Sequence, residues 1–406
     1  MLTTTTEPEV CTLPAPAEPV LAAGRRSAIN EEQVHAFTDS LFGENLHAKR
    51  VQSLALATLG VIHAASLSVH AIGQALAVAR GKQGKHGVKQ VDRLLSNSGI
   101  PVWELFALWV PYVLGQRSEA VVVLDWTDFE PDDQTTLVAS LVTQHGRATP
   151  LVWMTVQKSA LKGLRNLVED MVLSRLREVI PSEVKVTVLA DRGFADQKLY
   201  ALLEELGFDY VVRFRQCITV QSAEGERRKA ADWVPKTGHL RKLSQARVTA
   251  CRTQVGAVVC VKKKGMKEPW CLATSLHDAP AAQVVALYSR RFTIEENFRD
   301  TKDLRFGMGL SSMSIAEPDR RDRLLLLSAL ACALLTLLGA AGESLGMERQ
   351  LKANTVKRRT YSLFRQGCMY YDAIPNMPEH RLRPLIERFA QLVMQQPVFC
   401  GVFGLI

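Results

Sequence analysis

The segment VVVLD, residues 121–125, decides the fold class of this chain of 406 residues. Its four apolar residues are typical of a short strand buried within a sheet, and Asp125 follows them directly. The segment VKVTVLAD, residues 184–191, repeats the arrangement with Asp191 at its end. Because ligands of open α/β sheets bind beyond the carboxyl ends of the strands, both acids are candidate site residues. An Asp after a strand is also a common helix cap or turn residue, and that alternative stays open for each.

The segments around these two strands complete the order of a mixed sheet. Two further apolar runs, 137–142 and 150–156, follow the first strand. A helical pattern at 163–179 precedes the second strand, and a helix at 197–206 and a strand at 210–214 follow it. The order βββαβαβ predicts an α/β fold with a ribonuclease H-like core, in which helices cover the faces of a mixed sheet.

Both ends of the chain differ from this core. The pattern of residues 28–116 is helical, and basic residues outnumber acidic ones by five between residues 44 and 100. These features predict a helical DNA-binding domain, although an ordinary helical domain with solvated lysines fits them equally well. Residues 346–406 are predicted to be a helical region with a second basic cluster. Residues 1–27, rich in Thr, Pro, Glu and Ala, predict a disordered leader without a secretory signal.

The charge of the chain is unevenly distributed. Lys and Arg number 50 against 41 Asp and Glu, and this formal net charge of +9 favours nucleic acid over a membrane surface as the partner. Residues 213–268 alone contain 14 basic and 4 acidic residues, together with short apolar runs typical of strands. We therefore expect a basic, β-rich insertion at 213–275, which divides the core into a first part, 117–212, and a second part, 276–345.

Two features bear on the cellular location. The eight cysteines include no C-x-x-C pair and predict neither a zinc ribbon nor a disulfide framework, so a reducing cytoplasm is expected. Residues 324–341 form an uncharged run of eighteen residues, at the lower length limit for a membrane span. Because the run is rich in Ala and has no second span beside it, we predict a buried core helix and no membrane association.

A third acid lies on a predicted continuous helix, residues 286–303. Helical spacing places one aromatic ring, one carboxylate and three cations on a single face, formed by Tyr288, Arg291, Glu295, Arg299 and Lys302. The buried side is expected to consist of Phe292, Ile294 and Phe298. The charged face is then free for a ligand, unless it is merely a solvated, salt-bridged surface.

The three acids Asp125, Asp191 and Glu295 have no His or Cys among them. Oxygen ligands alone favour hard cations, so Mg²⁺ or Mn²⁺ is the expected cofactor. Two such ions, about 3.5 to 4 Å apart, can activate an attacking water or 3′-hydroxyl and stabilise the leaving oxygen in phosphoryl transfer. Acidic ligands inside a basic surround suit that chemistry on a phosphodiester.

At these residues the chain resembles a known family. The segments VLDWTD around Asp125, VLADRGFAD around Asp191 and YSRRFTIEENFRDTKD around Glu295 resemble the three motifs of bacterial DDE transposases, the group that includes the cut-and-paste transposases of composite transposons. The Y-(2)-R-(3)-E-(6)-K signature of this group is matched by Tyr288, Arg291, Glu295 and Lys302. The resemblance extends from about residue 40 to about residue 370.

The resemblance implies roles for individual residues. It makes Asp125, Asp191 and Glu295 catalytic ligands of two metal ions. The DNA-binding candidates, expected mainly to contact phosphates, are Tyr288, Arg291, Lys302, Arg192 and Arg299. Trp270, on the strand that leaves the insertion, is the candidate for stacking on a flipped base, and core packing is an equally good account of it.

Two neighbouring acids compete with these assignments. Asp128 lies three residues after Asp125, and Glu296 lies beside Glu295. We prefer Asp125 because the strand is expected to end there. We prefer Glu295 because Glu296 lies about 100° away around the helix.

The resulting hypothesis is an insertion-sequence transposase, a DNA-binding enzyme of the bacterial cytoplasm. It would bind the terminal inverted repeats of its transposable element, act as a magnesium-dependent endonuclease at the ends, and join the 3′-OH ends to target DNA. The resemblance implies a homodimer that holds two ends in a synaptic complex. A DDE-type nuclease without strand transfer and a catalytically inactive DNA-binding derivative are the alternatives.

Overall fold

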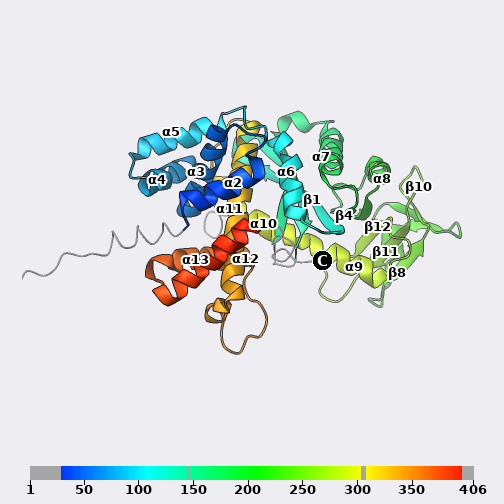
Figure 1. Ribbon diagram of the computed structural model, residues 1–406. Coiled ribbons are helices and arrows are strands. Elements are labelled where there is room, and N and C mark those ends of the chain that lie inside the picture. The colour runs from blue at the N-terminus through cyan, green and yellow to red at the C-terminus, as the bar shows by residue number, and fades with distance from the viewer. Residues whose placement is uncertain (1–28, 144–146, 303–307, 396–406) are drawn as a thin grey trace, which may run out of the picture.

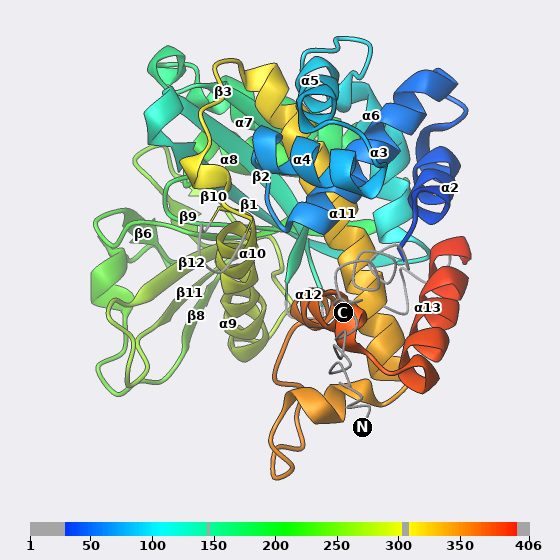
Figure 2. The ribbon, with the colours of Figure 1, turned by 90° about the vertical axis from the view of Figure 1, so that its left-hand side faces the viewer.

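The computed structural model describes residues 29–143, 147–302 and 308–395, except for the side chains of residues 296–298 and 312. The expected leader, residues 1–27, lies outside the described residues, as does the C-terminal region from residue 396 onward. A large mixed sheet forms the centre, and the N-terminal and C-terminal helices gather at the opposite end of the molecule from the strands of the basic interval (Figures 1 and 2). The chain has a mixed α/β fold.

The central sheet contains eight strands in the order β3-β2-β1-β4-β5-β12-β11-β8. The pairs β1/β4 and β4/β5 are parallel, and the other neighbours are antiparallel. The strands are β1 (Glu119–Phe129), β2 (Gln134–Val142), β3 (Ala148–Gln157), β4 (Lys185–Ala190), β5 (Asp209–Arg213), β8 (Arg241–Ser244), β11 (Ala257–Val261) and β12 (Trp270–Thr274). The five strands predicted from 121 to 214 are all present.

Side chains of β1 and β4 pack alternately into two layers, because successive residues of a strand point to opposite faces. Val121, Val123 and Leu189 pack with Val284 and Tyr288 of the helical segment on one face. The intervening residues of both strands belong to the larger core, which includes the helices α6 to α8. Burial on both faces explains why these strands are continuous apolar runs. The helices concerned are α6 (Val102–Leu114), α7 (Arg165–Val179), α8 (Gln197–Glu205), α9 (Ala281–Ser289) and α10 (Thr293–Lys302).

β1 is longer than the sequence predicts. It continues past Asp125 because its pairing with β2 extends to the pair Phe129 and Gln134. Its pairing with β4 stops at Leu124 and Ala190. The prediction that the strand ends at Asp125 is therefore wrong, although Asp125 does lie directly after the last parallel pair.

The strands of the basic interval extend the central sheet. β12 pairs with β5, and β11 and β8 follow it outward to the sheet edge. Four short strands form a second sheet in the order β10-β9-β6-β7, made of β6 (Thr219–Gln221), β7 (Arg227–Lys229), β9 (Arg247–Val248) and β10 (Thr253–Gln254). All three basic residues of β7 are exposed, and so are the lysines 262–264 between β11 and β12. The interval is thus β-rich with a basic surface.

The N-terminal region consists of α2 (Glu31–Phe42), α3 (Ala48–Ala64), α4 (Val69–Ala79), α5 (Gly84–Leu95) and α6. Asn30 caps α2 in a capping box with Gln33. Helices α4 and α5 approach closely where Gly73 faces Gly87, since a Cβ on Gly87 would lie 2.1 Å from the Gly73 carbonyl oxygen. The helices predicted for this region are present.

The apolar run at 324–341 lies in the helix α11 (Pro318–Ser344). By length and composition α11 could cross a membrane, and the helices α3 and α4 would qualify only as a pair bent by 99°. However, 83% of the apolar window of α11 is buried inside the protein, as predicted for a core helix. α11 packs most closely against α12 (Leu363–Ala373), where Gly339 and Gly367 leave no room for a Cβ, and it also contacts α13 (Glu379–Met394).

The predicted continuous helix at 286–303 is interrupted. α9 ends at Ser289, a 3₁₀ segment η4 spans Arg290–Phe292, and α10 begins at Thr293. The other short 3₁₀ segments are η1 (Glu130–Asp132), η2 (Ser159–Leu161), η3 (Ala230–Trp233), η5 (Leu310–Ser312), η6 (Met347–Leu351) and η7 (Ile374–Asn376). The tighter turn of η4 changes the directions of side chains on either side of it. A single uninterrupted face is therefore not formed.

Asp322 of α11 joins this helix to β3. Its carboxylate accepts hydrogen bonds from the backbone N–H of Thr155 at 3.1 Å and from the Thr155 hydroxyl at 2.6 Å. Burial raises the pKa of Asp322 to about 7. An unfolded Asp has a pKa of roughly 3.9, so the unfolded chain releases this proton first as the pH rises. The group therefore favours the folded state less and less from about pH 4 to about pH 7.

We expect Asp322→Asn to stabilise the protein above pH 7, by on the order of 1 kcal/mol, and to change stability little below pH 4. The amide oxygen still accepts both hydrogen bonds from Thr155, and the cost of a buried charge is removed. Urea unfolding at several pH values measures the difference. Asp319→Asn, at an exposed position of the same helix, is the control. A difference independent of pH would contradict this account of Asp322.

Candidate active site

The register of β1 against β4 brings the first two acids together. The parallel ladder ends at the pair Leu124 and Ala190, and Asp125 and Asp191 are the next residues of the two strands. Both side chains leave the ladder on the same edge of the sheet. The Asp191 carboxylate also accepts a hydrogen bond from the backbone N–H of Arg192, at 2.6 Å.

Arg291 connects the first acid to the third. Its Nη1 donates to Asp125 Oδ2 at 3.1 Å, and its Nη2 donates to Glu295 Oε1 at 2.9 Å. The Arg291 side chain is only 8% exposed, whereas Glu295 is 53% exposed. The buried Nε of Arg291 has no hydrogen-bond partner among the described residues. One guanidinium group thus occupies the space between two of the three carboxylates.

The protonation of Asp125 is governed by burial. Burial raises the pKa of Asp125 to about 6, Arg291 acts to lower it, and the negative charges of Asp191 and Glu295 add to the increase. Burial also raises the pKa of Tyr288, which keeps its phenol neutral. A cation is therefore needed beside Asp125 to hold its carboxylate in the charged form near neutral pH.

Glu268, at the end of the basic interval, binds two arginines at the rim of the site. Its carboxylate accepts from Arg192 Nη1 at 3.0 Å and from Arg213 Nη2 at 2.8 Å. The Arg192 side chain is half exposed, so this pair is weakly held and open to a competing anion. Arg192 follows Asp191 directly and remains close to the acids.

Three aromatic rings lie beside the cluster. Trp270 meets Tyr288 edge to face, with ring centres 5.0 Å apart, and stacks on Phe292 at 6.0 Å. Tyr288 is fully buried, so the expectation that it lines a free helix face is wrong. Phe292 is 43% exposed, so its predicted place on the buried side is also wrong, whereas Ile294 is buried as expected. Phe298 lies outside the described side chains. The break at η4 accounts for both differences, the burial of Tyr288 and the exposure of Phe292.

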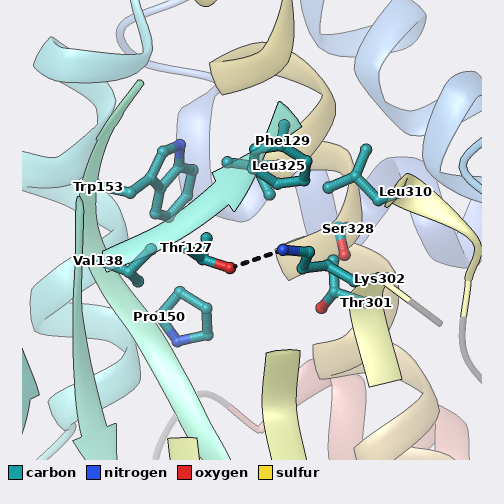
Figure 3. A pocket seen from close by; sticks show the side chains of 10 residues that line it. All are labelled: Thr127, Phe129, Val138, Pro150, Trp153, Thr301, Lys302, Leu310, Leu325 and Ser328. Atoms are coloured by element: carbon teal, nitrogen blue, oxygen red, sulfur yellow. Dashed lines mark hydrogen bonds between the residues drawn. The ribbon is translucent and has the colours of Figure 1, made fainter. Parts of the chain in front are cut away.

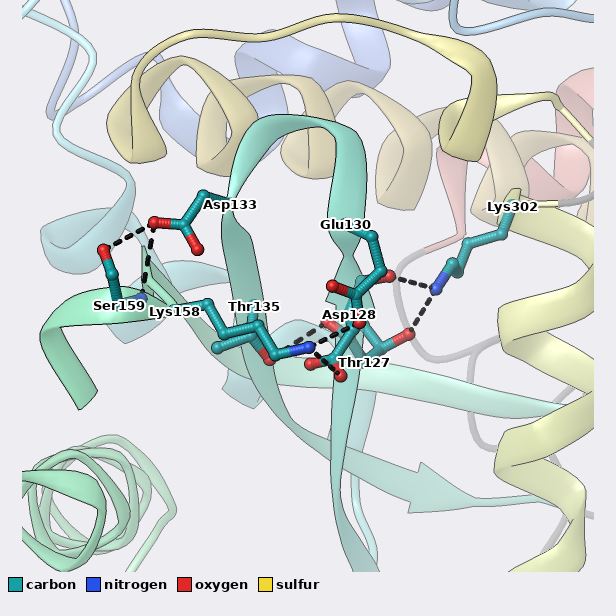
Figure 4. Close-up of polar contacts among 8 residues, drawn as sticks. All are labelled: Thr127, Asp128, Glu130, Asp133, Thr135, Lys158, Ser159 and Lys302. Carbon is teal, nitrogen blue, oxygen red and sulfur yellow. Dashed lines mark hydrogen bonds and ion pairs between the residues drawn. The ribbon is translucent and has the colours of Figure 1, made fainter. Parts of the chain in front are cut away.

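Lys302 lies beside Thr127, two residues beyond Asp125 on β1. Its Nζ donates to Thr127 Oγ1 at 3.1 Å and to the backbone oxygen of Asp128 at 2.6 Å (Figure 4). The ammonium group also lies 4.7 Å from the ring centre of Phe129. Burial lowers the pKa of Lys302. The residue ties α10 to the extension of β1 that the sequence does not predict.

A cavity of about 30 Å³ adjoins Lys302 and has room for a water molecule, but not for a substrate. Its walls come from β1, β2, β3, α10 and α11, and Val138, Trp153 and Leu325 are among the lining residues (Figure 3). The lining is mostly apolar, so this cavity is a packing defect of the core rather than a binding site.

The rival acid Asp128 is engaged elsewhere. Its carboxylate pairs with Lys158 at 2.9 Å, and Lys158 also contacts Glu130 (Figure 4). Burial acts to raise the pKa of Asp128, but hydrogen bonds from Thr135 and Lys158 outweigh it and lower the pKa. Because Asp125 and Asp128 are an odd number of residues apart on one strand, they point to opposite faces.

The structure therefore brings together Asp125, Asp191, Arg291, Glu295 and Tyr288 and places Lys302 at Thr127, two residues further along β1. Arg299 is exposed on α10. Within the described ranges no three acidic, His or Cys side chains are arranged as a closed metal site. The donor chemistry nevertheless suits a hard cation, because all three side chains are carboxylates, and a positive group, Arg291, already lies between Asp125 and Glu295 in this structure.

Some residues near the site escape sequence reasoning. Trp126 and Glu169 form a hydrogen bond across 43 positions, and Arg192 and Glu268 form an ion pair across 76 positions. The only sequence signal for Trp126 is its place after Asp125, from which it must point to the opposite face of the sheet. Glu169 and Glu268 carry no local signal at all.

The comparison with known families places the site in context. Residues 117–334 match the family described as transposase DDE domain. This range is more than half of the 406 residues and includes Asp125, Asp191 and Glu295. No curated protein matches the chain.

We expect Arg291→Gln to lower the free energy of unfolding at pH 8 by about 1 to 3 kcal/mol, because it leaves the buried Asp125 carboxylate without its cation. The deficit should shrink as the pH falls toward about 6 and be smallest below it, because Asp125 is then protonated in both proteins. Urea unfolding of the two proteins measures it. The neighbouring exposed Arg290 supplies the matched control Arg290→Gln, with an expected loss under about 0.5 kcal/mol. Equal losses of unfolding free energy in both variants would show that Arg291 does not stabilise the fold by compensating the charge of Asp125.

Proposed function

The chain belongs to the transposase DDE domain family and is a transposase, and from that premise we propose that it moves an insertion sequence by a cut-and-paste reaction. It would bind the terminal inverted repeats of its element, hydrolyse the DNA at the ends and join the 3′-OH ends to target DNA. The observation that carries the proposal is that Asp125 and Asp191 lie next to each other at the end of the β1/β4 ladder, with Glu295 linked to Asp125 through Arg291.

We assign the five strands β3-β2-β1-β4-β5 to a ribonuclease H-like core. The assignment is supported by the chain order of three strands followed by α7, β4, α8 and β5, and by the parallel pairing of β1, β4 and β5. In this arrangement the acids lie at the carboxyl edge of the parallel strands, where α/β sheets bind ligands. The core would comprise residues 117–212 and 276–345, with the interval 213–275 as its basic insertion.

The family uses divalent metal ions, and we propose Mg²⁺ or Mn²⁺, two per site, held by Asp125, Asp191 and Glu295. Carboxylate oxygens without His or Cys match these cations. When bound, divalent ions supply activation of the attacking oxygen and stabilisation of the leaving oxygen in phosphoryl transfer. The low accessibility around Asp125 would exclude bulk water and strengthen every charge interaction there.

Basic and aromatic residues of the chain would hold the DNA. Arg291, once it exchanges its carboxylate partners for a phosphate, would form a two-pronged contact, and its unpaired Nε adds a further donor. Arg192 would exchange Glu268 for a phosphate in the same way. The half-buried Trp270, stacked on the exposed Phe292, offers a ring face to an unstacked base. The buried ring of Tyr288 would pack against Trp270 and help to hold Trp270 and Arg291 in place.

We assign end recognition to the helical region 28–116, aided by the basic surface of 213–275 and by the region 346–406. The exposed side chains of Lys85, Lys89 and Arg93 lie at helical spacing on α5 and support an electrostatic contact with DNA phosphates. Arg299 and Lys302 would contact DNA beyond the acids. We also propose a homodimer that holds two ends in a synaptic complex, and a place in the bacterial cytoplasm.

Substitution of the three acids Asp125, Asp191 and Glu295, here called the triad, provides the test. With end-containing DNA and Mg²⁺, we expect Asp125→Asn, Asp191→Asn and Glu295→Gln each to reduce cleavage by at least about 100-fold, since each would remove a ligand of the metal. The matched controls are the rival acids, through Asp128→Asn and Glu296→Gln, which should keep most of the activity. Binding of the terminal repeats should survive in all five variants.

Full cleavage by all three triad variants would contradict the metal assignment. The joined products distinguish the two enzymatic alternatives, because a DDE-type nuclease cuts the ends but transfers no strand. An inactive DNA-binding derivative would bind the repeats with or without metal and cut nothing.

A further inference from the structure

We infer that the first two turns of α7 hold the two aspartate motifs in position, and that Glu169 is the positioning residue at their centre. The inference rests on the proposed function, because it assigns a role to residues behind the proposed metal ligands. It concerns the face of the sheet opposite to Arg291 and Glu295.

Strand geometry places Trp126 on that opposite face. Asp125 points toward α10, so Trp126, the next residue of β1, points toward α7. The indole Nε1–H of Trp126 donates to Glu169 Oε1 at 2.9 Å. Glu169 is 4% exposed, so its carboxylate is a buried acceptor aimed at the strand that carries Asp125.

Arg165 connects this contact to the second motif. Its Nε donates to Glu169 Oε1 at 3.1 Å. Its guanidinium carbon lies 5.1 Å from the ring centre of Trp126 and 5.9 Å from that of Phe194. Phe194 lies in the turn that follows Asp191, so one side chain of α7 contacts both motifs. The carboxylate of Glu169 fixes Arg165 in that position.

A second tie comes from Asn166. Its Nδ2 donates to Asp196 Oδ2 at 2.6 Å, and Asp196 caps the start of α8. The backbone N–H of Asp196 donates to the Phe194 oxygen, and the N–H of Phe194 donates to the Asp191 oxygen, at 2.7 and 3.0 Å. The turn after Asp191 is thus bound to α7 at two points.

These contacts matter because the sheet does not hold the acids together by itself. The β1/β4 ladder stops at Leu124 and Ala190, one residue before each acid. β1 is still held by β2 beyond this point, but the chain after Asp191 leaves the sheet. The spacing of Asp125 and Asp191 therefore depends on α7, which binds Trp126 on one side and the turn after Asp191 on the other.

The experiment uses the full-length protein and free Mn²⁺ as the probe, with binding measured by electron paramagnetic resonance in the absence of DNA. Glu169→Gln keeps an acceptor for Trp126 but loses the charge that holds Arg165. Trp126→Phe keeps a ring but loses the donor. We expect both to weaken Mn²⁺ binding about 10-fold, the size of effect found when outer partners of metal ligands are altered.

End cleavage should then require about 10-fold more Mn²⁺, while affinity for the terminal repeats without metal stays unchanged. Glu178→Gln is the matched control, because Glu178 lies on the same helix and pairs with Arg175, but is exposed and far from both motifs. It should behave like the unmodified protein. If Glu169→Gln fails to fold, two other variants test the same prediction. They are Trp126→Phe and Arg165→Gln, and the Arg165 side chain is half exposed.

Lower thermal stability with an unchanged Mn²⁺ midpoint in both variants would overturn the inference and leave α7 a purely structural support. The proposed function fails separately. If the unmodified protein binds Mn²⁺ and Glu169→Gln weakens that binding, but neither protein cuts end-containing DNA, the positioning role stands and the transposition proposal falls.

Discussion

Two like charges held side by side are the constraint on which the rest of the structure depends. Asp125 and Asp191 leave the sheet where β1 and β4 stop pairing, and the site around Asp125 is largely buried. Loss of hydration and mutual repulsion both favour the protonated form of Asp125. The fold must therefore provide a positive group at this point. Arg291 supplies it here, and a divalent cation is the proposed alternative.

The sheet allows the two sides of this site to do different work. Odd-numbered residues of β1 face α9 and α10, from which Arg291 and Glu295 reach the acids. Trp126 faces the other way and is held by Glu169 of α7. Charge compensation comes from one face, and position is controlled from the other. Neither α10 nor α7 could both compensate the charge of Asp125 and hold Trp126, because side chains of adjacent residues in a strand point in opposite directions.

Three strands of the basic interval, β8, β11 and β12, are part of the same sheet, and this continuity has consequences for the site. Because β12 pairs with β5, it carries Trp270 and the nearby Glu268 to the rim beside the acids. A separately folded insertion would have no fixed relation to them. The positive charge of the interval is exposed on the strand β7 and on the turn between β11 and β12.

The sequence by itself determined the strands and the acids. Four consecutive apolar residues before Asp125, and the run before Asp191, are local signals of burial on both faces. The core helix α11 was predicted from the length of its apolar run, from its Ala content and from the lack of a second span in the sequence. The spacing of Tyr288, Arg291, Glu295 and Lys302, together with the two Asp motifs, also indicates the family to which the chain belongs. These features can be predicted from the sequence because each depends on neighbours within a few residues.

Only the tertiary structure decided how those residues are used. The break at Arg290–Phe292 buries Tyr288 and exposes Phe292. Lys302 donates a hydrogen bond to the extension of β1 from 174 positions away in the sequence, and Trp126 donates one to Glu169, 43 positions away. Such partners are set by the register of the strands and by the packing of helices on the sheet. No local pattern encodes them, because their energies arise only when distant segments meet.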